Sequence, residues 1–447
     1  MRRIIAALVG LALLPIGTGY AQTSGDVTSF TLDNGMDVVV IEDHRSPAVV
    51  HMVWYRTGAA DEPEGKSGIA HFLEHLMFKE TETRESGEFS RIVEENGGDD
   101  NAFTSWDYTA YFQRVAADRL PLMMELEADR MANLRLNPDE VETERSVILE
   151  ERAQRTDSNP GALFNEEFRQ LAYPSHPYGI PVIGWRTEME TLSREDALAF
   201  YETYYAPNNA ILVVAGDVTP EEVRRLAQTY YGPLASAELP ARARVEDTTL
   251  PQDQRFEFAD ERVAQPYVMR SYRAPERDHG AQEDAAALSL LAEILGGAPS
   301  TSVLGRALQF DTQRSVFATA YYSGLSLDDT QFTLINMPSA GVTLAEAEAD
   351  LDEVIAEFLE RGIDPNQFER IKFLYEASDI YARDNASGLA RLYGMALTSG
   401  LEVEDVQNWP DVIAATTMDD VMDAARALFA DAPRVTGYLT QAQAAEN

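Results

Sequence analysis

Two histidines, His71 and His75, stand four residues apart in the segment His-Phe-Leu-Glu-His. On an α-helix, residues four apart lie about 40° from each other around the axis, so both imidazoles face one way and can share a metal ion. Glu74 lies on the flank of the same face, where its carboxylate can reach a water on the metal without binding the metal itself. This order reverses the H-E-x-x-H helix and matches the H-x-x-E-H signature of inverted zincins. The alternative interpretation is an amphipathic helix whose two histidines bind no metal.

A third ligand must come from another element, because catalytic zinc sites use three protein ligands and keep one open position. Three glutamates of the helix expected over Pro138 to Arg155 are candidates for this ligand, namely Glu144, Glu150 and Glu151. Glu144 and Glu151 are seven residues apart, which is two turns, and so share a face of that helix. Spacing alone does not choose among the three, and in an acidic chain simple hydration explains such residues equally well.

The helices that must position these side chains have clear signals in the sequence. Ser67 to Phe78 has the apolar spacing of a helix. Asn137 is expected to cap the next helix, with Pro138 at its first position and Glu140 reaching back to the cap. An Asn-Gly turn at 34–35, between two apolar runs, predicts a β-hairpin near the start of the chain.

Residues 232–252 differ in character from the rest of the chain. They contain several prolines among small and charged residues, with no clear period. This pattern indicates a linker between an N-terminal zinc-binding domain over 26–231 and a C-terminal domain over 253–447. Strands and helices are intermixed in both halves. The sequence therefore predicts an α+β fold of two homologous sandwich domains, each a mainly antiparallel sheet with packed helices.

The composition narrows the range of partners. The chain of 447 residues carries 75 acidic and 36 basic side chains, a net charge of −39, and no cysteine. Such a charge repels phosphate, so neither nucleic acid nor an anionic membrane is expected as a partner. Cationic peptides, basic proteins and divalent metals fit better. The absence of cysteine excludes disulfides, thiol nucleophiles and thiolate metal sites.

The N-terminus has the parts of a secretory signal. Met1 and two arginines form a basic start, an apolar run follows over residues 4–16, and small residues lead to Ala21. We expect a signal peptide over 1–21 that is cleaved before Gln22. The apolar run is too short to span a bilayer comfortably, and no later stretch is long enough. The mature protein is therefore expected in the periplasm, with no membrane anchor.

Together with Glu151, the His71–His75 segment resembles the pitrilysin (M16) family of zinc metallopeptidases. The resemblance is to the two-domain branch that includes the β-subunit of the mitochondrial processing peptidase and many bacterial homologues. It extends over nearly all of the mature chain. Further similar segments are Gly97-Gly98, Asn101 to Thr104, Tyr108, His176 to Gly179, Tyr204 to Ala210 and Gly216 to Val218.

The resemblance implies a zinc-dependent endopeptidase whose two halves form a clamshell, with a chamber between them in which short or unfolded peptides are cleaved. It assigns one Zn²⁺ per chain to His71, His75 and Glu151. It gives the role of general base to Glu74 and that of a supporting carboxylate to Glu144. An edge strand would receive the peptide substrate as an added β-strand. The residues of that strand are Asn101, Ala102, Phe103 and Thr104.

The second half departs from the family pattern. Active relatives often carry an arginine and a tyrosine seven residues apart there, which contact the substrate, whereas this chain has Gln309 and Val316 at the corresponding positions. Arg306, Arg314 and Tyr321 lie nearby in the sequence. The departure predicts that this chain is the zinc-bearing subunit of a heterodimer. A second M16-like subunit would supply the arginine and tyrosine, and the alternative assembly is a homodimer.

The second half also lacks a metal motif. Leu290 and Ile294 stand where the histidines would be, beside Glu293, so this half is expected to form the other wall of the chamber. Two alternative functions are a non-catalytic M16-like scaffold or assembly subunit and a zinc-binding protein without hydrolysis. The intact set of histidines and glutamates argues against the first, and Glu74 argues against the second. Manganese and cobalt would also suit these ligands.

Overall fold

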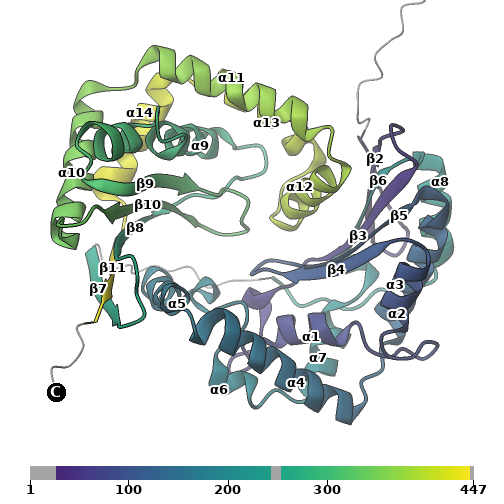
Figure 1. Cartoon of the computed structure of the whole chain (residues 1–447). Coiled ribbons are helices and arrows are strands. Elements are labelled where there is room, and N and C mark those ends of the chain that lie inside the picture. The colour runs from purple at the N-terminus through teal and green to yellow at the C-terminus, as the bar shows by residue number, and fades with distance from the viewer. Residues whose placement is uncertain (1–26, 243–252, 443–447) are drawn as a thin grey trace, which may run out of the picture.

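The computed structural model describes residues 27–242 and 253–442. It has two halves, each built on one β-sheet with packed helices, and the halves face each other like the two parts of a clamshell (Figure 1). The α+β class predicted from the sequence is confirmed. The expected signal peptide over 1–21 and residues 243–252 of the expected linker lie outside the described residues. In the part of the chain that the structure describes, no helix is long and apolar enough to cross a membrane.

The first half contains a six-stranded sheet with the order β1-β2-β6-β3-β5-β4. Neighbouring strands are antiparallel except β2 and β6, and the predicted hairpin is formed by β1 and β2. The strands are β1 (Val27–Thr31), β2 (Asp37–Glu42), β3 (Ala48–Tyr55), β4 (Asp99–Thr104), β5 (Thr109–Ala116) and β6 (Ala210–Gly216). The helices are α1 (Ile69–Leu76), α2 (Glu88–Glu95), α3 (Leu120–Asn133), α4 (Pro138–Arg152), α5 (Pro160–Ala172), α6 (Arg186–Met189), α7 (Arg194–Tyr204) and α8 (Pro220–Tyr230).

The second half contains a five-stranded sheet with the order β7-β11-β8-β10-β9, in which only β7 and β11 run parallel. Its strands are β7 (Asp253–Asp260), β8 (Tyr267–Ala274), β9 (Ser315–Tyr322), β10 (Thr330–Pro338) and β11 (Arg434–Gln441). Its helices are α9 (Glu283–Gly296), α10 (Leu344–Arg361), α11 (Pro365–Ala382), α12 (Ala386–Thr398), α13 (Val403–Ala415) and α14 (Met418–Asp431). The core of this half lies between the sheet and helices α9, α10 and α14.

Each half has one helix that packs on the sheet of the other half. Helix α12, late in the chain, packs on β6, β3 and β2 of the first sheet. A Cβ atom on Gly394 of α12 would lie 2.0 Å from the ring of Trp54 on β3, so only glycine allows this close approach. In return, α5 packs on β11 and β7, where Phe164 stacks on Phe256 with ring centroids 5.1 Å apart. This exchange ties the halves together, and the domain limits drawn from the sequence stay a prediction.

A buried histidine lies in the first sheet, on strand β3. The Nδ1 of His51 is 2.6 Å from Oε1 of Gln113, and its Nε2 is 2.9 Å from the hydroxyl of Tyr231. Burial lowers the pKa of His51 below its usual value of 6.5, although the nearby Glu127 favours the charged form. The folded chain therefore keeps this ring neutral at pH values where an unfolded chain would protonate it.

We expect His51 to make the protein less stable in acid. Between the lowered pKa and 6.5, the unfolded chain binds a proton at His51 that the folded chain does not, so the free energy of unfolding rises with pH. This contribution is complete above pH 6.5 and is lost as the pH falls towards the folded pKa, by at most about 1.4 kcal/mol per pH unit. Urea unfolding between about pH 5.5 and 7.5 should show a steeper loss in the wild type than in His51→Gln. Equal slopes would contradict the assignment.

Candidate metal centre

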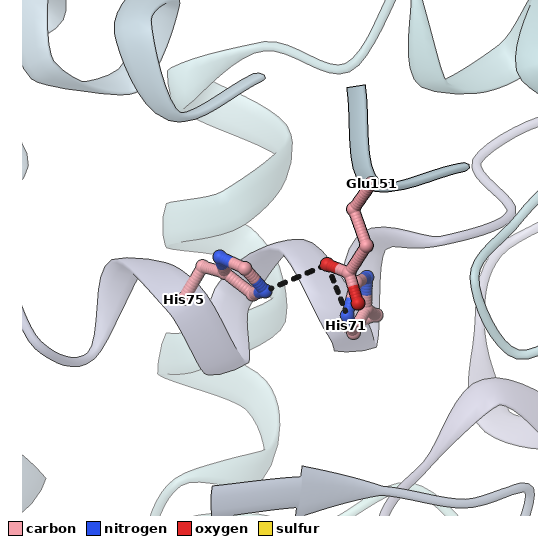
Figure 2. Close-up of side chains that lie close together, drawn as sticks. All are labelled: His71, His75 and Glu151. Carbon is pink, nitrogen blue, oxygen red and sulfur yellow. Dashed lines mark ion pairs between the residues drawn. The ribbon is translucent and has the colours of Figure 1, made fainter. Parts of the chain in front are cut away.

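Helix α1 is fixed at its start and along one side. It begins after Gly68, whose φ of 87° favours glycine, and the carboxylate of Glu62 accepts two backbone N–H groups of this first turn at 2.9 Å. Phe72 is fully buried in the core of the first half. The anchored apolar side leaves the face with His71 and His75 directed at α4 (Figure 2).

Helix α4 supplies the facing carboxylates. It begins as predicted, with Oδ1 of Asn137 accepting a hydrogen bond from the backbone N–H of Asp139 at 3.0 Å. The predicted return bond from Glu140 is not formed, and among the described residues Oε2 of Glu140 has no hydrogen-bond partner. The helix continues as one π-helical turn, Ala153–Asp157, soon after Glu151. Such turns are frequent at functional sites.

His71, His75 and Glu151 converge from the two helices (Figure 2). The Oε2 of Glu151 lies 3.5 Å from Nε2 of His71 and 3.4 Å from Nε2 of His75. Two ligand atoms at about 2.0–2.1 Å from a tetrahedral zinc are about 3.3–3.4 Å apart, so the donor set fits one zinc ion. Among the described residues, this is the only group of three or more histidine or acidic side chains that could hold a metal.

Glu144 contacts the ring nitrogen of His75 that is not directed at Glu151. Its Oε1 is 2.8 Å from Nδ1 of His75, and its Oε2 is 2.5 Å from Nζ of Lys79. A bond at Nδ1 leaves Nε2 directed at Glu151, which is the usual arrangement of a metal-binding histidine. Arg155 lies 2.5 Å from the other oxygen of Glu151. Lys79 and Arg155 belong to no sequence motif. Arg155 stands four residues after Glu151, a spacing that places helical side chains side by side, whereas the contact between Lys79 and Glu144 joins two segments distant in the sequence and has no such signal.

The two histidines of the trio have opposite pKa shifts. Burial and the nearby His75 lower the pKa of His71 to about 4. Burial would also lower the pKa of His75, but its hydrogen bonds with Glu144 and Glu151 raise it to about 9. The hydrogen bond with His75 lowers the pKa of Glu151. At neutral pH His71 and Glu151 are therefore in their metal-binding forms, whereas His75 must release a proton to bind.

Glu74 lies beside the trio on α1 and is not part of it. Its Oε2 accepts a hydrogen bond from the hydroxyl of Thr104 at 2.5 Å, and burial raises the pKa of Glu74 above its usual value. A carboxylate with a raised pKa is suited to take up and return a proton near neutral pH. Because Thr104 is the last residue of β4, this contact joins the helix to the edge of the sheet.

Strand β4 carries the four candidate substrate-strand residues. It lies at the edge of the first sheet and pairs on one side with β5. The side chain of Asn101 is exposed at the edge, and its Oδ1 accepts a hydrogen bond from the N–H of Ala102 at 2.8 Å. Phe103 packs edge-on against Trp54 at 5.2 Å and lies 4.1 Å from the guanidinium of Arg391 on α12, so its side chain belongs to the packing layer. A peptide could therefore pair with the backbone of β4, through the hydrogen-bonding groups at its free edge.

The second half adds no metal-binding group within the described residues. Leu290 and Ile294 are fully buried in its core. The side-chain amide of Gln309 donates to the carbonyl of Ala318 at 3.2 Å, and Val316 is 56% exposed. Neither Gln309 nor Val316 provides a cation or a phenol.

A two-sheet clamshell with an inverted zincin helix has the features of a class of two-domain metallopeptidases. The family model described as Insulinase (Peptidase family M16) matches residues 37–185, and the one described as Peptidase M16 inactive domain matches residues 191–375. The zinc protease PqqE of Helicobacter pylori is 30% identical over 421 residues, which is 92% of each chain. An uncharacterized zinc protease of Mycobacterium leprae is 33% identical over 310 residues, 69% of this chain and 67% of the relative. The chain belongs to peptidase family M16, as the resemblance predicted.

Solved structures share the whole fold. The crystal structure of a protease from Helicobacter pylori has a TM-score of 0.85 at 28% identity and covers 93% of this chain and 100% of that one. The first half of the periplasmic protease PqqL from Escherichia coli has a TM-score of 0.77 at 20% identity, with 93% and 92% coverage, and shows the similarity of fold alone.

Removing the partner of His75 tests the role of Glu144. We expect Glu144→Gln to weaken zinc binding by about 10- to 100-fold, because His75 loses the carboxylate that orients its ring. Competition with a chromophoric chelator measures this affinity. Glu150→Gln, an exposed neighbour on the same helix, is the matched control and should bind zinc like the wild type. An unchanged affinity in Glu144→Gln would contradict the role.

Proposed function

We propose that this chain is a zinc-dependent endopeptidase that hydrolyses short or unfolded peptides between its two halves. The observation that carries the proposal is the convergence of His71, His75 and Glu151 beside Glu74. A scaffold or a zinc store has no need for the Glu74 carboxylate at this position. The relatives named as zinc proteases support the same activity.

The roles proposed for the side chains follow from their positions. Zinc held by the trio supplies Lewis acidity and lowers the pKa of a water to near 7. Glu74 takes a proton from the attacking water and passes it to the leaving amine, because its carboxylate lies on α1 beside the two histidines. The hydroxyl of Thr104 orients the Glu74 carboxylate. The backbone of β4 receives the peptide as an added strand, a mode that accepts many sequences.

We further propose that the chain is the zinc-bearing subunit of a periplasmic heterodimer. Gln309 and Val316 leave the second half without the arginine and tyrosine that active relatives use. A second M16-like subunit would supply those groups, and a homodimer is the alternative assembly. The signal-like N-terminus ending at Ala21 supports the location.

The test uses a quenched, unstructured peptide and the purified mature chain loaded with zinc. Turnover by the chain alone that a chelator stops and zinc restores would support the peptidase and overturn the heterodimer. Turnover that begins only when a second M16-like chain carrying the arginine and tyrosine is added would support both proposals. No turnover in either case would contradict the peptidase.

A further inference from the structure

A cavity of about 460 Å³ lies between the two halves, at the end of the edge strand. It is lined by the loop that follows β4, by α5, by β9 and β10 with the residues between them, and by one residue each of β8 and α12. Thr104 contacts Glu74, and the next residue, Ser105, already lines the cavity. A peptide that extends along β4 past Glu74 would therefore bring a residue close to the cleaved bond to this opening.

Arg169 on α5 is the basic side chain of this lining. Its guanidinium carbon lies 3.8 Å from the ring centroid of Trp106, and its Nε donates to the carbonyl of Tyr178 at 3.1 Å. Its two terminal nitrogens are neither sealed from solvent nor hydrogen-bonded to any described residue. No carboxylate of the described chain lies within the 4.0 Å of an ion pair. The two terminal nitrogens of the stacked Arg169 side chain are therefore hydrogen-bond donors that pair with no carboxylate of the described chain.

The rest of the lining does not neutralise this charge. Its one acidic side chain is Asp107, whose Oδ2 already accepts hydrogen bonds from the hydroxyl of Tyr178 at 2.6 Å and the N–H of Leu327 at 3.2 Å. Burial lowers the pKa of Arg169, and no described carboxylate forms an ion pair that would offset this effect. In a chain with a net charge of −39, an arginine without an acidic partner in a cavity is a feature that a bound anion would explain.

We propose that this cavity binds a carboxylate of the peptide substrate through the terminal nitrogens of Arg169. The chain would then prefer peptides with an acidic side chain, or with their C-terminal carboxylate, within a few residues of the cleaved bond. The proposal rests on the proposed peptidase function and names a substrate class for it. It runs against the preference for cationic peptides that the overall charge suggests.

Matched peptides separate the two sources of the carboxylate. One series carries Glu or Gln at each of about three positions on either side of the cleaved bond, with the C-terminus amidated. A second series carries no acidic residue and ends in either a free or an amidated C-terminus near that bond. At one position we expect kcat/KM for the carboxylate peptide to exceed that of its neutral match by about tenfold, the usual gain from a charged hydrogen bond.

Three variants of the chain test the role of Arg169. In Arg169→Gln the preference should fall to about one, and Arg169→Glu should instead favour Lys at the same position, which also shows that the variant is folded. Arg361→Gln, which removes an exposed arginine from α10 with the same change in charge, should keep the wild-type preference. A preference that persists in Arg169→Gln, or no preference in the wild type, would overturn the proposal.

A binding measurement separates this proposal from the peptidase. Fluorescence anisotropy of the same labelled peptides on zinc-loaded Glu74→Gln needs no turnover. Tighter binding of the carboxylate peptide that depends on Arg169 supports the cavity even if no peptide is cleaved. Equal binding of both peptides overturns it even if the chain is an active peptidase.

Discussion

Replacing Glu74 with glutamine is expected to lower kcat for peptide cleavage by about a thousandfold while zinc remains bound. Glu74 is half-buried beside the trio and accepts a hydrogen bond from Thr104, so glutamine keeps the shape and that hydrogen bond but cannot accept a proton. General base catalysis by a positioned carboxylate contributes typically about 10²- to 10⁴-fold. The variant and the wild type are compared with the same quenched peptide, under the subunit conditions that give wild-type turnover.

The control for this substitution is Glu150→Gln, which changes an exposed glutamate on α4 and should keep full activity. Zinc content measured on the same samples shows whether the metal site is intact. Cleavage by Glu74→Gln at the wild-type rate would exclude Glu74 as the base. Loss of zinc from this variant would show that Glu74 belongs to the ligand set instead.

Replacing a member of the trio is expected to weaken zinc binding by more than about a thousandfold, well beyond the effect of losing a supporting residue. Glu151→Gln removes the charged oxygen that lies 3.5 Å and 3.4 Å from the two histidines, and His75→Ala removes one imidazole. Both variants should also lose the rise in Tm that zinc gives the wild type, because only a ligand that binds the folded state stabilises it.

The measurements are zinc affinity by chelator competition and Tm with and without zinc. Glu144→Gln and Glu150→Gln give the graded comparison, with a partial loss in the first and none in the second. A zinc-dependent Tm that survives in both Glu151→Gln and His75→Ala would place the metal elsewhere in the protein.

Much of the fold is local in origin and could be predicted. The Asn-Gly turn gives the β1–β2 hairpin, the cap at Asn137 starts α4, and the spacing of His71 and His75 on a helix places both imidazoles on one face. Local signals also have limits, because Glu140 does not return a bond to the cap although its position allows one.

What could not be predicted depends on contacts between distant segments. The exchange of α5 and α12 between the halves comes from surfaces that fit only after both sheets have formed, such as Gly394 against Trp54. The choice of Glu151 over Glu144 and Glu150 needs the approach of α4 to α1, which spacing on a single helix cannot provide. The cavity at Arg169 likewise combines residues from both halves.

The central claim is that His71, His75 and Glu151 hold one catalytic zinc. Native mass spectrometry of the purified chain after dialysis against limiting zinc tests it most directly. We expect one zinc per chain in the wild type and in Glu74→Gln, and none in Glu151→Gln. A wild-type chain without zinc, or a Glu151→Gln chain that retains it, would contradict the claim.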